Sequence, residues 1–160
     1  MNIGVLFDLD GVVIDSESIY TDFWIDIEKI FPTRIENFAL KIKGSTLPTI
    51  LNTYYPDEEK QAVIMSKIVD FEKSMQYRPF PEALRFIREL KEAGIRCAIV
   101  TSSSQNKMNN LYLQNPGFKE LFDAVITGDV VTHSKPHPEP YLMGASAIGI
   151  QPENCYVFED

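Results

Sequence analysis

The sequence predicts an α/β protein, with a doubly wound, Rossmann-like parallel sheet as its core and a helical cap inserted after the first strand. Short apolar runs that predict strands occur at residues 3–7, 97–100, 124–127 and 155–158, and the first two have the character of buried parallel strands. Helical patterns separate the last three runs, an alternation typical of parallel sheets with helices on both faces. Residues 16–78 show helical patterns alone. Because a single crossover needs only one helix, the extra helices predict a separate lobe.

Composition and charge narrow the function classes. The chain has 160 residues, of which 44% are apolar and 24% charged, the ordinary range for a globular domain or a core with a small lobe. A net charge of -8 argues against a nucleic-acid partner but still allows a pocket for a small anion. Cys97 and Cys155 lie in apolar runs, which favours buried free thiols. Without a basic leader or a membrane-length apolar stretch, we expect a cytoplasmic monomer that binds neither nucleic acid nor membranes.

Two aspartates at the end of the first apolar run form the centre of the predicted site. Side chains alternate along an extended chain, so Asp8 and Asp10 point the same way and Leu9 the other. Gly11 lets the backbone turn directly afterwards. The carboxyl ends of parallel strands line the ligand crevice of an open sheet, and two like charges there need a cation between them. The alternative is an acidic turn that merely ends the strand.

The insert is predicted to be helical. Ser16 suits the N-cap of a first helix that ends before Pro32. Its apolar stripe comprises Ile19, Phe23, Ile27 and Ile30. Further helices are expected over 46–55 and 57–75. The expected domains are a core of residues 1–15 and 79–160 and a cap of residues 16–78, the alternative being that these helices simply cover the sheet.

The rest of the chain continues the alternation of strands and helices. Pro81 opens a helix at its first turn, and Gly94 fits the position after its end. Further helices are expected over 105–114 and 140–148. The helices over 105–114 and 140–148 lie between the second, third and fourth strands. With the helix that opens at Pro81, they complete the predicted cover of the sheet.

Each later strand ends in a polar signature. Thr101 and Ser102 follow the second strand and offer hydroxyl and backbone N–H groups at a helix start, which suits a phosphate group. Lys135 follows the third strand in a loop stiffened by prolines, and Glu159 and Asp160 follow the fourth. Each signature also has an ordinary explanation: helix capping, a solvated lysine or an acidic turn. In a parallel sheet, however, all of them fall at one edge.

The run Asp8-Leu9-Asp10-Gly11-Val12 resembles the first motif of the haloacid dehalogenase superfamily. The following Asp15-Ser16 narrows this resemblance to the β-phosphoglucomutase-like group. The Thr/Ser position, the Lys-Pro-x-Pro loop and the acidic pair match the other three motifs in order. The resemblance extends over the whole chain, including the helical insert.

The resemblance implies a division of roles. Asp8 would be the nucleophile that forms an aspartyl-phosphate, and Asp10 the general acid and then the general base. The phosphoryl oxygens would be held by Thr101, Ser102 and Lys135. The ligands of Mg²⁺ would be Asp8, the backbone carbonyl of Asp10, Asp160 and the nearby Glu159.

The chain also departs from the group's pattern. Mutases carry a histidine in the first cap helix and an arginine after the cap-loop glycine, where this chain has Tyr20 and Leu47. Lys43 lies in the segment that resembles the specificity loop, and it is expected either to contact substrate or to be a surface lysine. His133 and His137 fall at positions that the pattern does not require, and we expect them to be structural or exposed.

These observations predict a Mg²⁺-dependent phosphatase that hydrolyses a small phosphorylated metabolite, such as a sugar or polyol phosphate, through an aspartyl-phosphate. A sugar phosphate mutase and a non-catalytic, phospho-ligand-binding fragment remain as alternatives. Members of the group continue past the acidic pair with a helix and a further strand. We therefore expect the C-terminal part of the core to be missing from this chain.

Overall fold

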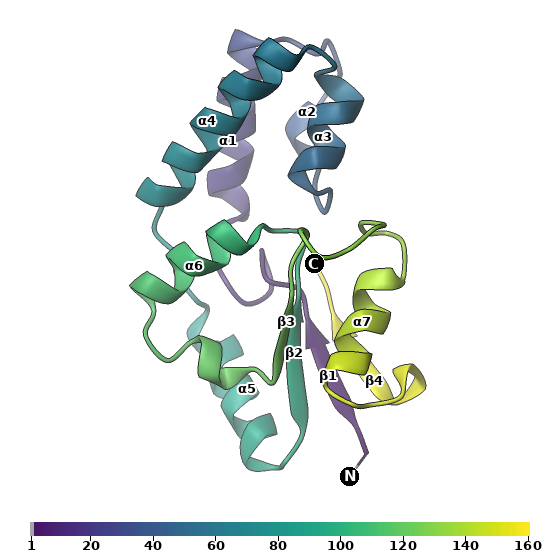
Figure 1. Cartoon of the computed structure of the whole chain (residues 1–160). Helices are drawn as coiled ribbons and strands as arrows, with labels where there is room; N and C mark the ends of the chain where they lie inside the picture. Colours follow the sequence, from purple (N-terminus) through teal and green to yellow (C-terminus); the bar gives the residue numbers. More distant parts are fainter. Residues whose placement is uncertain (1) are drawn as a thin grey trace.

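The core of the protein is a parallel sheet of four strands in the order β3-β2-β1-β4 (Figure 1). The computed structural model describes residues 2–160. The strands are β1 (Gly4–Phe7), β2 (Arg96–Val100), β3 (Ala124–Ile126) and β4 (Cys155–Phe158). After β1 the chain adds β2 and β3 on one side and later returns to place β4 on the other. The carboxyl ends of β1 and β4 therefore flank the topological switch point, where open α/β sheets bind their ligands.

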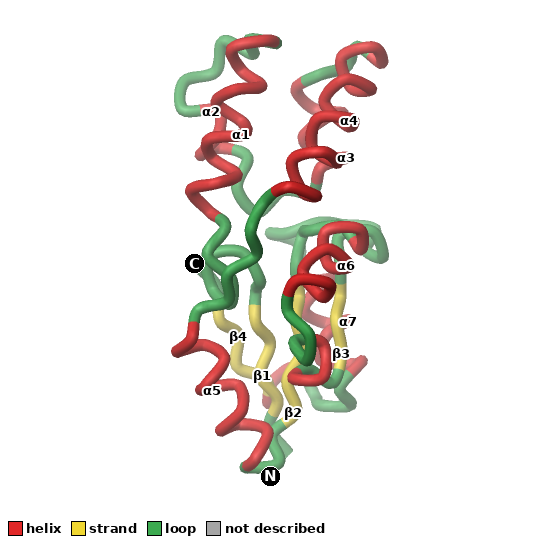
Figure 2. Tube along the Cα trace, turned by 90° about the vertical axis from the view of Figure 1, so that its left-hand side faces the viewer, coloured by secondary structure: helices red, strands yellow, loops and turns green. Residues whose placement is uncertain are grey.

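Helices cover both faces of this sheet, as the predicted doubly wound fold requires. Side chains alternate along β1, so Val5 and Phe7 join one core cluster and Leu6 joins another. The first cluster contains residues of α5 (Pro81–Glu92) and α6 (Gln105–Gln114), and the second contains residues of α7 (Glu139–Ala147). Figure 2 shows α5 and α7 on opposite sides of the strands. Strand β1 and most of β2 are thus buried from both sides, whereas the edge strand β4 is exposed along most of its length.

The first four of the five helices between β1 and β2 stand beyond the carboxyl ends of the strands (Figure 1). They are α1 (Glu17–Ile30), α2 (Phe38–Lys41), α3 (Leu47–Tyr54) and α4 (Glu58–Ser74). These helices bury a hydrophobic cluster of their own, with Trp24, Ile27 and Ile64 among its members. They pack mainly on one another, and Ile19, Tyr20 and Phe71 of this group also pack against the core cluster that contains Val5 and Phe7.

The two segments that join these helices to the core run side by side. Asp15 N donates to the carbonyl oxygen of Arg78 at 2.8 Å, and Phe80 N donates to the carbonyl oxygen of Val13 at 2.9 Å. Between these bonds, Ile14 and Pro79 form an antiparallel bridge. The chain therefore leaves and re-enters the core at one narrow place.

Several details differ from the sequence expectations. Ile30 is 50% exposed and Trp24 only 5% exposed, so the predicted apolar stripe of α1 is wrong at its end. A periodic pattern cannot show where the partner helices stop. Helix α2 was not predicted, because its four residues are too short to show a period. Cys97 and Cys155 are free thiols, the first buried and the second half-buried. Across residues 2–160, no helix has both the length and the apolar character needed to cross a bilayer.

Candidate active site

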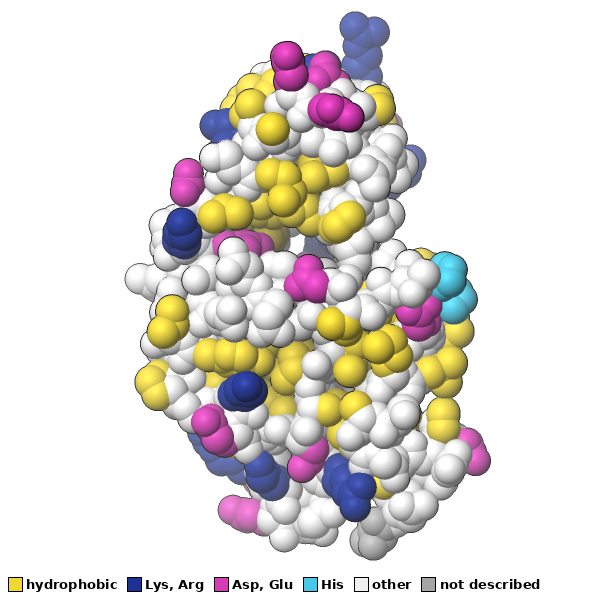
Figure 3. Space-filling model, in the orientation of Figure 1, with side chains coloured by type: hydrophobic (Ala, Val, Ile, Leu, Met, Phe, Trp, Pro, Cys, Tyr) yellow, Lys and Arg dark blue, Asp and Glu magenta, His cyan; other side chains and the backbone are white. Residues whose placement is uncertain are grey.

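The predicted site residues line a single cavity between the helical insert and the sheet. Its wall includes Asp8, Asp10, Lys43, Thr101, Ser102, Lys135, Glu159 and Asp160. Figure 3 shows the hollow between the two parts of the molecule. The cavity measures about 150 Å³. Drug-sized ligands occupy pockets of roughly 300 Å³ or more, so this cavity suits a smaller compound.

Carboxyl groups from β1 and β4 meet at the switch point. Carboxylate oxygens of Asp8, Glu159 and Asp160 lie within 4.8 Å of one another. Gly11 makes this approach possible, because it adopts a φ of +77° and a Cβ there would lie 3.3 Å from the Asp160 Oδ2 atom. The same Cβ would lie 2.9 Å from the Glu17 Cγ atom. The turn after β1 therefore leaves room for the acidic pair that follows β4.

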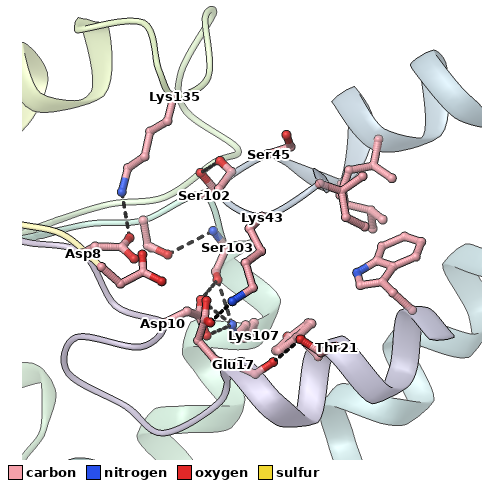
Figure 4. Close-up of a pocket in the computed structure, with 18 of the residues that line it drawn as sticks. Asp8, Asp10, Glu17, Thr21, Lys43, Ser45, Ser102, Ser103, Lys107 and Lys135 are labelled. Atoms are coloured by element: carbon pink, nitrogen blue, oxygen red, sulfur yellow. Dashed lines mark hydrogen bonds and ion pairs between the residues drawn. The ribbon is translucent and has the colours of Figure 1, made fainter. Parts of the chain in front are cut away.

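Lys135 reaches into this acidic cluster from the loop after β3 (Figure 4). Its ammonium donates to Asp8 Oδ1 at 2.7 Å and to Glu159 Oε1 at 2.7 Å. The side chain is 9% exposed, and its ammonium lies 5.0 Å from the centre of the Tyr141 ring. The structure therefore contradicts the reading of Lys135 as a solvated surface lysine.

The Asp8 carboxyl group is buried, and its charge is only partly balanced. Burial raises the pKa of Asp8 to about 6, even though the charge and hydrogen bond of Lys135 act in the opposite direction. The nearby Asp10 and Glu159 raise it further. Carboxyl groups outnumber lysines around the cavity. Converging carboxylate oxygens with excess negative charge fit a hard divalent cation such as Mg²⁺, and a cation there would favour the ionised form of Asp8.

Asp10 turns away from this cluster toward helix α6 (Figure 4). Its two carboxylate oxygens accept hydrogen bonds from Lys107 at 2.5 and 2.7 Å. Ser103 donates to the same carboxylate at 2.8 Å, and Ser16 donates as well. Burial would raise the pKa of Asp10, but the lysine and both serines hold it below its usual value. Only the backbone carbonyl of Asp10 therefore remains for the predicted metal contact, because its side chain is bound elsewhere.

The contact between Ser16 and Asp10 also corrects the expected cap of α1. Ser16 occupies the N-cap position, but its side chain makes no capping hydrogen bond to the helix. The hydroxyl group donates to Asp10 instead. A sequence pattern for capping shows that serine suits the position but not which acceptor its hydroxyl chooses.

Sequence reasoning missed Lys107. This side chain is 2% exposed, and its ammonium lies 4.2 Å from the centre of the Tyr20 ring. A signal was present in the sequence: Lys107 stands in the first turn of α6, where the positive end of the helix dipole disfavours a cation. A lysine at such a position needs an anionic partner, but the sequence does not show that this partner is Asp10.

The predicted phosphate and cap residues connect the two parts of the molecule. Thr101 is buried, and its hydroxyl accepts a hydrogen bond from the backbone N–H of Ser103 at 3.1 Å. Ser102 Oγ donates to the carbonyl oxygen of Gly44 at 2.6 Å. Lys43 lines the cavity while its ammonium pairs with Glu17. The loop that carries Lys43 thus lies directly against the loop after β2.

The histidines lie on the surface near the start of α7, as predicted. His133 and His137 are exposed, and neither is among the residues that line the cavity. Glu139 accepts hydrogen bonds from the backbone N–H groups of Thr132 at 2.5 Å and His133 at 3.1 Å. Nδ1 of His133 lies 2.6 Å from the same carboxylate. Their contacts therefore hold the turn that precedes α7.

Fold and site together define a class of protein. The chain is a doubly wound α/β protein with an acidic, lysine-containing cavity at the switch point and a helical layer over it. Comparison with known proteins identifies the family. A model of the haloacid dehalogenase-like hydrolases matches residues 4–160, so the chain belongs to this hydrolase family.

Curated relatives match nearly the whole chain. Fructose-1-phosphate phosphatase YqaB of Escherichia coli K12 is 27% identical over 169 residues, which cover 98% of this chain and 86% of that protein. Pyrophosphatase PpaX of Oceanobacillus iheyensis is 30% identical over 166 residues, which cover 98% of this chain and 73% of that protein. The family resemblance drawn from the motifs is confirmed by these matches.

Solved structures agree with the fold. A β-phosphoglucomutase candidate from Bacteroides vulgatus superposes with a TM-score of 0.79 at 28% identity, over 97% of this chain and 66% of that one. CbbY of Rhodobacter sphaeroides, solved in complex with phosphate, gives a TM-score of 0.74 at 22% identity over 100% of this chain and 78% of that one. The first places the chain near the β-phosphoglucomutase-like group, and the second supports the fold alone.

Proposed function

We propose that the chain is a Mg²⁺-dependent phosphatase that hydrolyses a small phosphorylated metabolite through an aspartyl-phosphate on Asp8. Membership of the hydrolase family and the phosphatase relatives support the hydrolysis of phosphoric monoesters. One observation carries the other two parts of the proposal, the aspartyl-phosphate and the dependence on Mg²⁺. Asp8, Lys135 and the acidic pair meet at the switch point. This arrangement supplies a nucleophile, a cation for phosphoryl oxygens and ligands for a metal ion.

The chemistry follows from the positions of these groups. An Asp8 carboxylate oxygen attacks the phosphorus atom, forming an oxygen–phosphorus bond while the bond to the leaving-group oxygen breaks. The Lys135 ammonium lies 2.7 Å from Asp8 Oδ1. Together with Thr101 and Ser102, it stabilises negative charge on the transferring phosphoryl group. Asp10 is ionised in the free protein, because Lys107 and two serines hold its pKa below the usual value, so it must take up a proton before it can act as the acid. It then gives this proton to the leaving oxygen and later takes one from the water that hydrolyses the aspartyl-phosphate.

Mg²⁺ would be held by Asp8, Asp160, Glu159 and the backbone carbonyl of Asp10. The carboxylates of the first three converge within 4.8 Å, which is the donor chemistry that this ion prefers. When bound, it shields the approach of an anionic nucleophile to an anionic substrate.

Residues 16–78 would act as a cap domain that selects the leaving group. Lys43 and Ser45 from this segment line the same cavity as Asp8 and Asp10. A relative that acts on fructose 1-phosphate and the small volume of the cavity favour a sugar or polyol phosphate over a larger ester.

Phosphate release from a panel of phosphorylated metabolites tests this proposal. Turnover should require Mg²⁺, and both a chelator and Asp8→Asn should abolish it. Asp22→Asn serves as the matched control, because Asp22 is exposed on α1 and does not line the cavity. Undiminished turnover after chelation or by Asp8→Asn would contradict the proposal, and bisphosphate-dependent interconversion of sugar phosphates would point to a mutase instead.

A further inference from the structure

Lys107 is a buried lysine that the proposed chemistry does not use. Its ammonium donates to Asp10 Oδ1 at 2.5 Å, to Asp10 Oδ2 at 2.7 Å and to Ser103 Oγ at 2.9 Å. An ammonium group has three N–H donors, so each donor already has a partner within the protein. With the side chain 2% exposed, Lys107 has neither a spare donor nor the surface needed to bind a substrate anion. Its role must therefore be exercised on Asp10.

The base of this lysine is rigid. Met108 and Leu111 of the same helix are 0% exposed and belong to the core cluster beneath β1. The Ser104 hydroxyl caps the helix by accepting from the backbone N–H of Lys107 at 3.2 Å. The Tyr20 ring covers the ammonium at 4.2 Å. A charge held in this way fixes the position of whatever it binds.

Asp10 is held on both carboxylate oxygens. Lys107 binds each of them, Ser103 donates to Oδ2 at 2.8 Å, and Ser16 donates to Oδ1. Such paired, charge-assisted contacts restrict rotation of a carboxylate as well as stabilising its charge. A group that transfers protons must lie within about 2.6–3.2 Å of its partner, and misplacement by about 1 Å can lower the rate about 100-fold.

We propose that Lys107 is a positioning residue that, together with Ser103, holds the Asp10 carboxylate in the orientation needed for proton transfer. This inference rests on the proposed function, in which Asp10 is the acid and base. It assigns different tasks to two cavity lysines. Lys135 contacts Asp8 at the reacting end, whereas Lys107 acts only through Asp10.

A kinetic double-mutant cycle tests this role. The variants are Lys107→Met, Asp10→Asn and their combination, each assayed with the best phosphate ester of the panel. Lys107→Met should lower kcat about 100-fold, with KM changed less than about threefold, because the substrate does not touch the lysine. In the Asp10→Asn background it should cause no further loss. Lys107→Arg, which can still bind both carboxylate oxygens, should recover part of the rate.

Two further variants separate positioning from folding. Ile87→Ala removes a buried side chain from α5, which carries none of the contacts to Asp10 or Lys107, so it should lower the melting temperature and leave kcat unchanged below it. Ser103→Ala removes one of the bonds to Asp10 and offers a milder variant should Lys107→Met fail to fold. It should lower kcat about 10-fold, again without effect in the Asp10→Asn background.

The outcomes distinguish the two levels of the proposal. If the kcat losses of Lys107→Met and Asp10→Asn multiplied in the double variant, or if Lys107→Met mainly raised KM, the positioning role would be overturned. The proposed phosphatase activity would be unaffected by either result. An active wild type whose Asp10→Asn variant turns over normally would refute the catalytic role of Asp10 and this inference with it. A wild type without turnover on any phosphate ester would refute the proposed function itself.

Discussion

Asp8 and Asp10 are chemically identical side chains two positions apart, yet their surroundings push their pKa values in opposite directions. Burial raises the pKa of Asp8 to about 6, because the charge and hydrogen bond of Lys135 offset only part of the cost of desolvation. The pKa of Asp10 is lowered, because Lys107 and two serines outweigh its burial. The charge of Asp8 is therefore poorly compensated and open to a metal ion, whereas the Lys107 contact keeps Asp10 ionised in the free protein.

The two aspartates should therefore affect stability in opposite ways. Without Mg²⁺ at pH 7, Asp8→Asn should raise the free energy of unfolding by about 2 kcal/mol, because the raised folded-state pKa makes ionised Asp8 a cost. Asp10→Asn should lower it by about 3 kcal/mol, because Lys107 is left buried without its anionic partner. Urea unfolding measures both. Equal changes in the same direction would contradict this account.

The pH dependence of turnover should report Asp8. Its pKa lies above the unfolded value, so the stability that protonation of Asp8 contributes is present at low pH and is lost as pH rises from about 4 through about 6. Turnover changes in the opposite sense, since only the ionised group attacks. At low Mg²⁺ concentration the acid limb of kcat/KM should lie near pH 6 and move to lower pH as Mg²⁺ rises. A limb that stays in place would argue against a metal ion at Asp8.

At the scale of elements, the site depends on where strands and helices end. Asp8 follows β1 and the acidic pair follows β4, so the parallel register of these neighbouring strands brings the carboxyl groups together. The turn at Gly11 completes the arrangement, because its positive φ and missing side chain leave space beside Asp160. The element boundaries therefore determine the site as directly as the side chains do.

A pair of glycine substitutions separates backbone strain from crowding of the site. Gly11→Ala should lower the free energy of unfolding by about 1–2 kcal/mol and also weaken Mg²⁺ binding, because its Cβ would press on Glu17 and Asp160. Gly94→Ala is the control, since Gly94 has a φ of +73° with open space around it. It should cost similar stability and leave Mg²⁺ affinity unchanged. Equal effects on Mg²⁺ binding, measured by calorimetric titration, would be inconsistent with this reading.

The sequence predicted these elements well, because strand runs, proline starts and glycine ends are local signals. Helix α6 has the predicted bounds, and β4 ends directly before the acidic pair. It did not predict the choice of hydrogen-bond partner. Lys107 and Asp10 are 97 positions apart, and nothing local shows that they meet. The diversion of the Ser16 hydroxyl to Asp10 has the same cause, since it depends on tertiary packing.

At the scale of the molecule, the helical insert and the core touch at the cavity and join through two adjacent segments. Ser102 contacts the backbone of Gly44, and the hydroxyl groups of Thr49 and Ser134 lie 3.4 Å apart. The paired segments near Asp15 and Arg78 form the covalent connection. Such a connection suits a hinge, whose closure over the cavity would exclude water from the attacking carboxylate.

Substitution of Lys43 should change substrate preference without removing the chemistry. Lys43→Ala should raise KM several-fold and alter the order of preferred substrates, because Lys43 lines the cavity from the insert. Lys41→Ala is the matched control, as an exposed lysine two positions away that does not line the cavity. Steady-state kinetics over the substrate panel measures both. An unchanged profile would show that this loop does not read the leaving group, and loss of all turnover would place Lys43 in the chemical machinery.

The most direct measurement is the location of the phosphoryl group during turnover. Rapid acid quenching followed by peptide mass spectrometry should find one phosphoryl group on Asp8 in the presence of Mg²⁺, and none after chelation or in Asp8→Asn. This result would establish the nucleophile and the metal dependence together. Steady turnover with no phosphoryl group on Asp8, or with the group on another residue, would contradict the account.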